Sequence, residues 1–387
     1  GERALVVDVG ALDRIAVPQG DYVRVGAGAR WTRVVAGTHA SGLTPPVLTD
    51  YLDLTVGGTL SVGGVGGQSF AHGLQVDNVS ELEVVTGAGR RMRCSPHLHP
   101  ELFHGCLGGL GQLGVIVEAT LRLVPAPSRV RVRHLPFDDI AGFLDAQHVL
   151  ARSGACDYLV GNFLPPNAPQ RGADGWSLSI EHVEHLGVVG RSAPSGRLPS
   201  ELGARLDREP PARELGYLEY VHRLDAIVRA WRSSGAWTAW HPWMDLFVPH
   251  EGAAAAIELA LDGLDRDALG EGYVMTYPLL GEHQRAELPA LPGAAASFLF
   301  DILPTIARGE HARLAALRER YDRVLAVALD SGATIYPIGH PLGRPTMDVA
   351  LWHRVLGPRL DELARARRIH DPDGICGADL ALFRTRM

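Results

Sequence analysis

The stretch that decides the fold is Thr49–Phe70, TDYLDLTVGGTLSVGGVGGQSF. It places six glycines within Gly57–Gly67, shortly after an acidic residue, Asp50. Glycine lets backbone N–H groups approach a ligand or another chain segment closely, and successive exposed N–H groups form sites suited to phosphates. Three hydroxyl side chains lie in the same stretch: Thr55, Thr59 and Ser61. The pattern therefore predicts a loop that contacts a phosphate or a flavin, with a tightly packed turn as the alternative.

The bulk composition is that of an ordinary globular chain of two or three domains. The 387 residues are 46% hydrophobic and 21% charged, with a net charge of -7. This charge argues against a nucleic-acid protein, and no apolar run reaches the roughly 18 residues that a membrane span needs. The four cysteines are scattered without a CxxC pair, which favours free thiols in a reducing cytoplasm. The clustered histidines His97, His99 and His104 fit no metal-ligand spacing, so we expect no metal site.

The first third of the chain reads as β-rich. Strands are expected at 4–9, 21–31 and 113–127, a hairpin at 79–95, and short helices at 31–42 and 100–109. The segment Gly109–Gly114 fits GxGxxG, but a dinucleotide fingerprint needs a helix after it. Here the strand-like VIVEATLRLV follows, so close backbone packing is the better interpretation.

The rest of the chain alternates between helical and strand-like patterns. Helices are expected at about 138–153, 211–233, 250–264, 310–331 and 352–368, and a surface loop at 191–213. Strands are expected within 157–165, 176–184, 272–280, 297–303 and 334–339. A β-rich first part followed by a mixed second part predicts an α+β protein.

Several quoted segments together resemble the cytokinin dehydrogenases, flavoenzymes of the vanillyl-alcohol-oxidase superfamily. They are the glycine stretch and its continuation to Cys94, LFHGCLGGLGQLGVIVEATLRLVPAP, HPWMDLFVP at 241–249, YPLL at 277–280 and DPDGICGADLALF at 371–383. The resemblance implies an FAD-linked-oxidase (PCMH-type) domain built from both chain ends. It also implies an inserted substrate domain on an antiparallel sheet flanked by helices. The expected boundaries are 1–126, 127–337 and 338–387.

The same resemblance implies roles for individual residues. Asp50 falls on the catalytic acid that accepts the substrate amine proton while hydride goes to the flavin; a helix or turn cap is the alternative. Trp243 would line the substrate pocket, unless it is ordinary core, and His72 matches a family histidine that is otherwise structural. Residues implied to contact FAD are Thr55, Gly57, Gly58, Ser61, Gly64, Gly67, Gln68 and Val115.

The chain also departs from the family pattern. The family has Asn, Arg, Glu, Asn and Gln where this sequence has Val62, Ala71, Val160, Asp245 and Leu380. No Gly-His-Ser, the element that carries the covalent flavin histidine in the family, occurs in the sequence. Because unmatched buried polar groups cost about 1–3 kcal/mol, these losses predict a site that no longer holds an adenine-like ligand. We therefore expect a chain without a cofactor, the alternative being that FAD is retained.

The functional hypothesis from these departures is a cofactor-independent cyclase or cycloaddition catalyst. A vacated flavin volume would bind a bulky hydrophobic, polyketide-like molecule and hold it folded, which lowers the barrier of an intramolecular reaction. Asp50, Tyr51 and Asp245 would be catalytic. The pocket would be lined by Val160, Trp243, His72 and Leu380. Two alternatives stay open: an FAD-dependent oxidase or dehydrogenase of an amine or alcohol, and a non-catalytic carrier of a hydrophobic metabolite.

Overall fold

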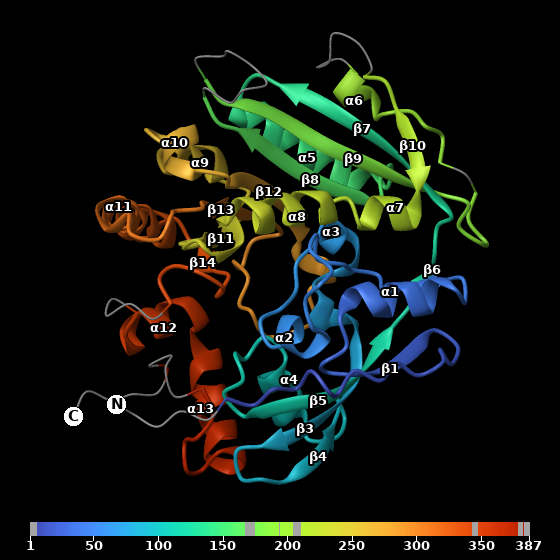
Figure 1. Ribbon diagram of the computed structural model, residues 1–387, viewed down its shortest axis with the longest axis vertical. Coiled ribbons are helices and arrows are strands. Elements are labelled where there is room, and N and C mark those ends of the chain that lie inside the picture. The colour runs from blue at the N-terminus through green and yellow to red at the C-terminus, as the bar shows by residue number, and fades with distance from the viewer. Residues whose placement is uncertain are drawn as a thin grey trace.

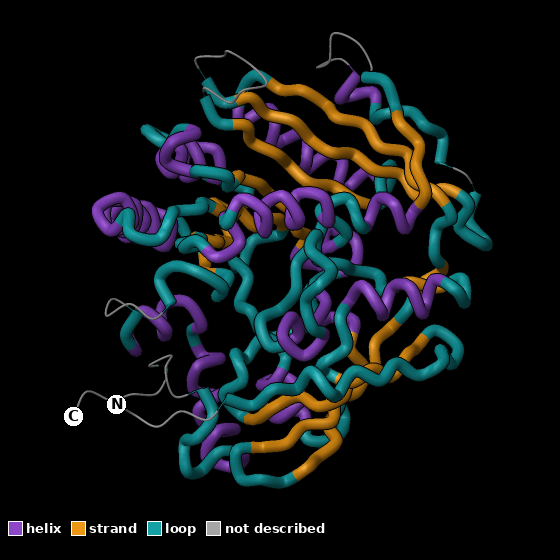
Figure 2. Tube along the Cα trace, viewed as in Figure 1, coloured by secondary structure: helices purple, strands orange, loops and turns teal. Residues whose placement is uncertain are grey.

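The computed structural model describes residues 6–166, 175–192, 194–203, 210–342 and 347–377, together with Leu382. Two antiparallel sheets lie at opposite ends of the molecule (Figure 1), and the space between them holds mostly loops and short helices (Figure 2). The glycine-rich stretch belongs to this middle layer. The fold is α+β, as predicted.

The small sheet has four strands in the order β1-β5-β3-β4. Its strands are β1 (Tyr22–Gly26), β3 (Val79–Thr86), β4 (Arg91–Cys94) and β5 (Gly114–Arg122), and a separate two-stranded ladder joins β2 (Leu43–Thr44) to β6 (Val124–Pro125). The helices around it are α1 (Trp31–His39), α2 (Val56–Leu60), α3 (Ser69–His72) and α4 (Pro100–Cys106). The hairpin predicted at 79–95 is confirmed, since β3 pairs with β4.

The large sheet has eight strands in the order β10-β7-β9-β8-β12-β13-β11-β14. They are β7 (Arg129–Phe137), β8 (Tyr158–Leu164), β9 (Ser177–Leu186), β10 (Arg213–Gly216), β11 (Met244–Pro249), β12 (Tyr273–Leu280), β13 (Ala296–Leu303) and β14 (Thr334–Ile335). Every pairing within it is antiparallel. The antiparallel sheet that the sequence predicted is therefore present.

Helices of the second part fall into three groups. Behind the large sheet lie α5 (Ile140–Ser153), α9 (Ala253–Leu261), α10 (Arg266–Leu269) and α11 (His311–Asp330). In front of it lie α7 (Tyr217–Val221) and α8 (Asp225–Ser234), with α6 (Ser200–Gly203) at one end. Helix α12 (Val349–Leu356) joins the apolar cluster of the large sheet, and α13 (Pro358–His370) continues to the small sheet, where it packs on α4. Helix α13 thus lies against the part of the molecule that holds the small sheet.

The large sheet divides the core because successive side chains of a strand point to opposite faces. On β8, Tyr158 and Val160 join the apolar cluster shared with the small sheet, whereas Leu159 and Phe163 join the cluster under α5, α9 and α11. The face that carries Tyr158 and Val160 is therefore the one turned toward the glycine-rich stretch.

Most predicted elements are present, and the exceptions have physical causes. The strand expected at 4–9 is wrong for its described part, where Val6 is 89% exposed and unpaired. The helix expected at 211–233 is β10, α7 and α8, and the one expected at 352–368 is broken at Gly357 before Pro358. Strands β7 and β11 were not predicted; β11 is buried at five of its six residues and therefore shows no alternation.

None of the helices in the described part of the chain has the length and apolarity that a bilayer crossing needs. Within the same residues, no group of three or more His, Cys, Asp or Glu side chains is placed to hold a metal ion. All four cysteines are free thiols, and three of them are buried.

Candidate active site

At most glycine positions of the stretch Gly57–Gly67, other parts of the chain pack so closely that a side chain would not fit. Thr55 caps α2 by accepting the Gly58 N–H, and the Gly57 N–H bonds the Ala27 carbonyl at 2.8 Å. A Cβ on Gly67 would overlap the Tyr158 ring, and one on Gly63 would overlap Pro289. The tightly packed turn is thus present. It lies against Tyr158 of the large sheet and against Tyr336.

A smaller part of the stretch stays partly open. Thr55, Gly58, Ser61 and Val62 are half-buried or exposed, and α2 packs on β5, where Val115 is also half-buried. Beside Gly64, the side-chain oxygen of Gln75 is buried and accepts no hydrogen bond from the residues that the structure describes. Half-buried hydroxyls and an orphaned acceptor are a set that fits a polar, N–H-bearing group such as FAD.

Asp50 lies at the centre of a polar cluster between the two domains. Its carboxylate accepts hydrogen bonds from the Tyr158 hydroxyl at 2.5 Å and the Arg223 guanidinium at 2.9 Å. The hydroxyl of Tyr277 also lies within hydrogen-bonding reach of it. The side chain of Asp50 is 16% exposed, so the carboxylate is both held in place and reachable.

Arg223 connects Asp50 to a second acid. Its guanidinium lies 5.0 Å from the Tyr158 ring centroid and 4.4 Å from that of Tyr220. The guanidinium also pairs with Glu181 at 3.4 Å, and Glu181 accepts the Tyr220 hydroxyl at 2.5 Å. Two rings and two carboxylates hold a planar cation in one orientation, which an ammonium group would not match.

Burial keeps the tyrosines of this cluster protonated. Burial, opposed by Arg223 and reinforced by Asp50, raises the pKa of Tyr158 well above its usual value. Burial and the Asp50 charge act in the same direction on the pKa of Tyr277. Both hydroxyls are therefore hydrogen-bond donors at neutral pH, and they aim at the same carboxylate.

Cross-strand register places the other predicted pocket residues on this face. Val160 is buried and lies opposite Glu181 on β9. Asp245, on β11, lies opposite Asp301 on β13, and both are buried. Trp243 immediately precedes β11, and its indole N–H is buried without a described partner. The face is thus apolar around Val160 and acidic around Asp245.

Tyr51 lies in other surroundings. Tyr51 bonds Asp53 and Arg232, each at 3.3 Å, and its ring meets Trp237 edge-on. No bond between Tyr51 and the Asp50 cluster occurs within the described residues. Leu380 lies outside the described residues.

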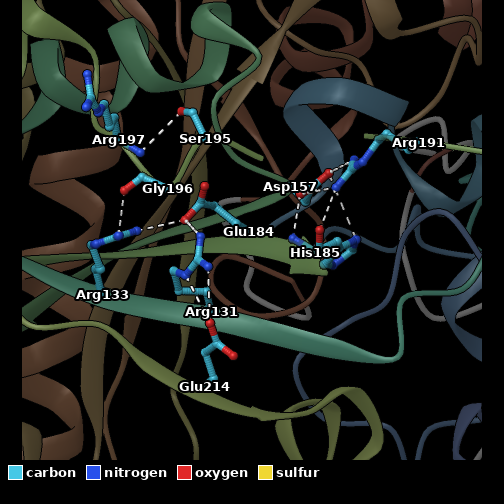
Figure 3. Close-up of polar contacts among 10 residues, drawn as sticks. All are labelled: Arg131, Arg133, Asp157, Glu184, His185, Arg191, Ser195, Gly196, Arg197 and Glu214. Carbon is cyan, nitrogen blue, oxygen red and sulfur yellow. Dashed lines mark hydrogen bonds and ion pairs between the residues drawn. The ribbon is translucent and has the colours of Figure 1, made fainter. Parts of the chain in front are cut away.

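His72 and Gln68 line a separate hollow of about 270 Å³ between the two domains. Its polar wall is formed by Asp157, which bridges His185 and Arg191 (Figure 3). Burial lowers the pKa of His185 to about 4, despite the nearby Asp157 carboxylate. The hollow is therefore lined by a neutral imidazole and an ion pair that is already satisfied.

Sequence reasoning missed Tyr158, Tyr277, Arg223, Glu181 and Asp301. Arg223 is 173 residues from Asp50 and stands in a helical pattern that looks like solvated surface. Asp301 carried a usable signal, because an acid within the apolar run SFLFDIL is costly to bury unless it has a function.

Comparisons with known proteins identify what the chain resembles. A family model described as FAD binding domain matches residues 1–95, and one described as cytokinin dehydrogenase 1, FAD and cytokinin binding, matches residues 209–383. An uncharacterized oxidoreductase, ORF5 of the fasciation locus of Rhodococcoides fascians, is 33% identical over 96% of this chain and 82% of its own length.

Plant relatives are similar over much of the chain. Cytokinin dehydrogenase 4 of Arabidopsis thaliana is 30% identical over 94% of this chain and 73% of its own length. Cytokinin dehydrogenase 8 of Oryza sativa subsp. indica is 34% identical over 80% of this chain. The match spans 63% of the rice protein, slightly under two thirds.

Two expectations from the sequence are wrong. The matched FAD-binding model and the relatives point to FAD, which contradicts a chain without a cofactor. The same relatives are oxidoreductases and dehydrogenases, which contradicts a cofactor-independent cyclase acting on a polyketide-like molecule. The departures at Val62 and Ala71 leave in place the half-buried Thr55 and Ser61 hydroxyls and the orphaned Gln75 oxygen, so they do not remove the polar groups that could hold FAD.

Proposed function

Because the chain belongs to the cytokinin-dehydrogenase-like family of FAD-linked oxidoreductases, we propose that it is an FAD-dependent dehydrogenase of an amine, with Asp50 as proton acceptor. The substrate amine loses hydride from carbon and a proton from nitrogen, which leaves an imine. Several relatives are named cytokinin dehydrogenases, so cytokinins are the first substrates to test.

The observation that carries this proposal is the setting of Asp50. A carboxylate fixed by Tyr158 and Arg223 has little freedom to rotate, so its orientation toward a bound amine is set in advance. Tyr277 supplies a further donor on the sheet side. A positioned carboxylate that stays 16% exposed is suited to accept a proton in the transition state.

The residues proposed to hold the cofactor are the open part of the glycine-rich stretch and its neighbour on β5: Thr55, Gly58, Ser61 and Val115. The Gly58 and Ser61 N–H groups are already bonded within the chain. The Thr55 and Ser61 hydroxyls would therefore bind polar parts of FAD, Gly58 and Val115 would leave room for it, and the orphaned Gln75 oxygen would accept an N–H. Bound FAD supplies a two-electron acceptor for the hydride. The buried glycines Gly57, Gly64 and Gly67 would act by shaping the loop.

The residues proposed to hold the substrate lie on the facing surface of the large sheet. Val160 and Trp243 give an apolar wall that excludes water from the reacting carbon. Asp50 lies at one end of this wall, where the amine nitrogen must be placed for proton transfer. A hydrophobic amine, rather than a highly charged one, is the expected substrate.

The proposal predicts that Asp50→Asn leaves FAD binding intact but slows flavin reduction. The purified chain is loaded with FAD, mixed anaerobically with an isopentenyl-substituted adenine, and followed by the loss of flavin absorbance. The variant should be slower by about 10²–10⁴-fold, the usual contribution of a positioned general base.

The matched control is Asp13→Asn, which removes an exposed carboxylate whose ion-pair partner is Arg33 rather than a residue of the Asp50 cluster. It should reduce flavin as fast as the unchanged protein. Equal rates for Asp50→Asn and the unchanged protein would remove Asp50 from the mechanism, and failure to bind FAD would refute the function itself.

A further inference from the structure

Glu181 is a second acid beside the proposed proton acceptor, and it has no part in the mechanism proposed above. It lies on β9 directly opposite Val160, and its side chain is 13% exposed. The Arg223 guanidinium binds both acids through different nitrogens: Nη2 lies 2.9 Å from Asp50, and Nε lies 3.4 Å from Glu181. The Tyr220 hydroxyl donates to the same Glu181 oxygen at 2.5 Å. One cation is therefore shared by two carboxylates.

The sharing matters because an arginine weakens a nearby carboxylate as a base. An aspartate paired with an arginine alone usually has its pKa lowered by about one to three units. A carboxylate with such a low pKa accepts a proton poorly in the transition state. A second negative charge beside the same guanidinium opposes this effect. The charge of Glu181 therefore favours proton transfer to Asp50.

The state after proton transfer leads to the same conclusion. Asp50 becomes neutral when it takes the proton from the substrate nitrogen, so the Arg223 guanidinium, which is 21% exposed, loses one charged partner. A partly buried cation without a counter-ion is costly. Burial opposes the charged form of Arg223, but Asp50, two tyrosines and Glu181 together raise the pKa of Arg223. Glu181 remains beside Nε, so the cation keeps an anionic partner after Asp50 is protonated.

The other titratable groups near Asp50 come from four packed elements: Tyr158 of β8, Tyr273 and Tyr277 of β12, Asp301 of β13 and Tyr220 of α7. Burial raises the pKa of each of these tyrosines above its usual value, so all four are neutral. Burial also raises the pKa of Asp301 to about 7, so this acid is mostly uncharged in acid solution. Within the described residues, this leaves Arg223 and Glu181 to set the charge around Asp50.

We propose that Glu181 is a positioning residue that keeps Arg223 from pairing with Asp50 alone, so that Asp50 stays basic enough to accept the amine proton. This role rests on the proposed amine dehydrogenase function. Glu181 acts through Arg223 and needs no contact with the substrate. Neutralising Glu181 should therefore make Asp50 a weaker base without removing a group that touches the amine.

The first test measures the Asp50 carboxyl group without turnover. The FAD-loaded protein carries aspartate labelled with carbon-13 at the side-chain carboxyl, and the NMR resonance that disappears in Asp50→Asn is assigned to Asp50. Glu181→Gln keeps the shape of the side chain and removes its charge. The titration midpoint of the Asp50 resonance should then fall by roughly one pH unit. A midpoint that stays in place or rises would overturn the proposal.

Two further variants separate local charge from other effects. Glu181→Asp keeps the charge, so its midpoint should lie nearer to that of the unchanged protein than to that of Glu181→Gln. Glu219→Gln removes an equal charge from α7, where the glutamate is 62% exposed and pairs with Arg213. Its midpoint should match that of the unchanged protein, because exposed charges are screened by water and salt. A fall in either control as large as that in Glu181→Gln would overturn the role of the Glu181 charge.

The second test follows anaerobic flavin reduction by an isopentenyl-substituted adenine across a range of pH. The rate should fall in acid, where Asp50 is protonated, and Glu181→Gln should move this fall to lower pH by the same amount as the NMR midpoint. A pH profile that does not move would overturn the proposal. If no amine reduced the flavin of the unchanged protein, the proposed function would fail, but the carboxyl titration would still decide the role of Glu181.

Discussion

At the scale of single residues, the protein uses one cation to hold two acids in the same small volume. Arg223 pairs with Asp50 and Glu181 while its faces meet the rings of Tyr158 and Tyr220. Partly buried charges are costly unless they are paired, so each acid depends on this guanidinium. Arg223 is therefore a positioning residue for Asp50 and a stabilising residue for the domain junction.

Replacing Arg223 by Met keeps the length of the side chain but leaves Asp50 and Glu181 without a cation. We expect the free energy of unfolding to fall by about 1–3 kcal/mol, below the range for fully buried pairs because the site is partly solvated. The free energy of unfolding of Arg223→Lys should lie between those of Arg223→Met and the unchanged protein, since lysine restores the charge without the planar guanidinium. Urea unfolding followed by circular dichroism measures the change.

The control for this prediction is Arg232→Met on α8. Arg232 is half exposed, and its nitrogen lies 3.8 Å from the Asp53 carboxylate. An exposed pair of this length contributes little, so the loss should stay under about 0.5 kcal/mol. Equal losses in Arg223→Met and Arg232→Met would show that the Arg223 cluster is no more than surface charge.

At the scale of elements, the glycine-rich stretch is a joint between two sheets as well as a proposed cofactor surface. Gly67 lies against the Tyr158 ring, and its carbonyl accepts the Leu159 N–H at 2.9 Å. The loop therefore fixes where β8 lies relative to α2 and α3. Because Tyr158 bonds Asp50, the position of this joint also sets the geometry of the carboxylate.

Gly67→Ala should destabilise the protein by overpacking. A Cβ at this position overlaps the Tyr158 ring, and such insertions cost about 1–3 kcal/mol in a well-packed core. Gly293→Ala is the matched control, because its Cβ would meet nothing within 4 Å and the residue is exposed. Thermal unfolding measures the stability of both variants. If Gly67→Ala were as stable as Gly293→Ala, close packing of Gly67 against Tyr158 would not hold the two sheets together.

At the scale of the whole molecule, the sequence predicted what repeats locally or stands in motifs. Alternation and helical spacing located most elements, and a tightly packed turn was one of the two interpretations given for the glycine stretch. What it did not predict depends on contacts between distant segments: Arg223 reaches Asp50 across 173 residues, and Asp301 meets Asp245 across two strands. Neither pairing leaves a local pattern, because tertiary packing alone brings the partners together.

The shared core also decides how the molecule unfolds. One apolar cluster includes Val25 and Leu60 of the first domain and Tyr158, Tyr277 and Phe247 of the large sheet. Unfolding one domain would therefore expose apolar surface of the other to water, which costs a free energy of about 25 cal/mol per Å². We expect the two domains to unfold in one cooperative transition rather than in two.

This expectation is tested with two probes that report on different domains. Trp31 is buried in the first domain and Trp243 lies beside the large sheet, so single-tryptophan variants that keep one or the other give separate fluorescence signals. Their urea transitions should coincide. FAD at a concentration one hundred times its dissociation constant should raise the free energy of unfolding reported by both probes by about 2.7 kcal/mol. Two separate transitions, or a shift confined to Trp31, would mean that the junction transmits no stability, and the Asp50 cluster would then have to be held by one domain alone.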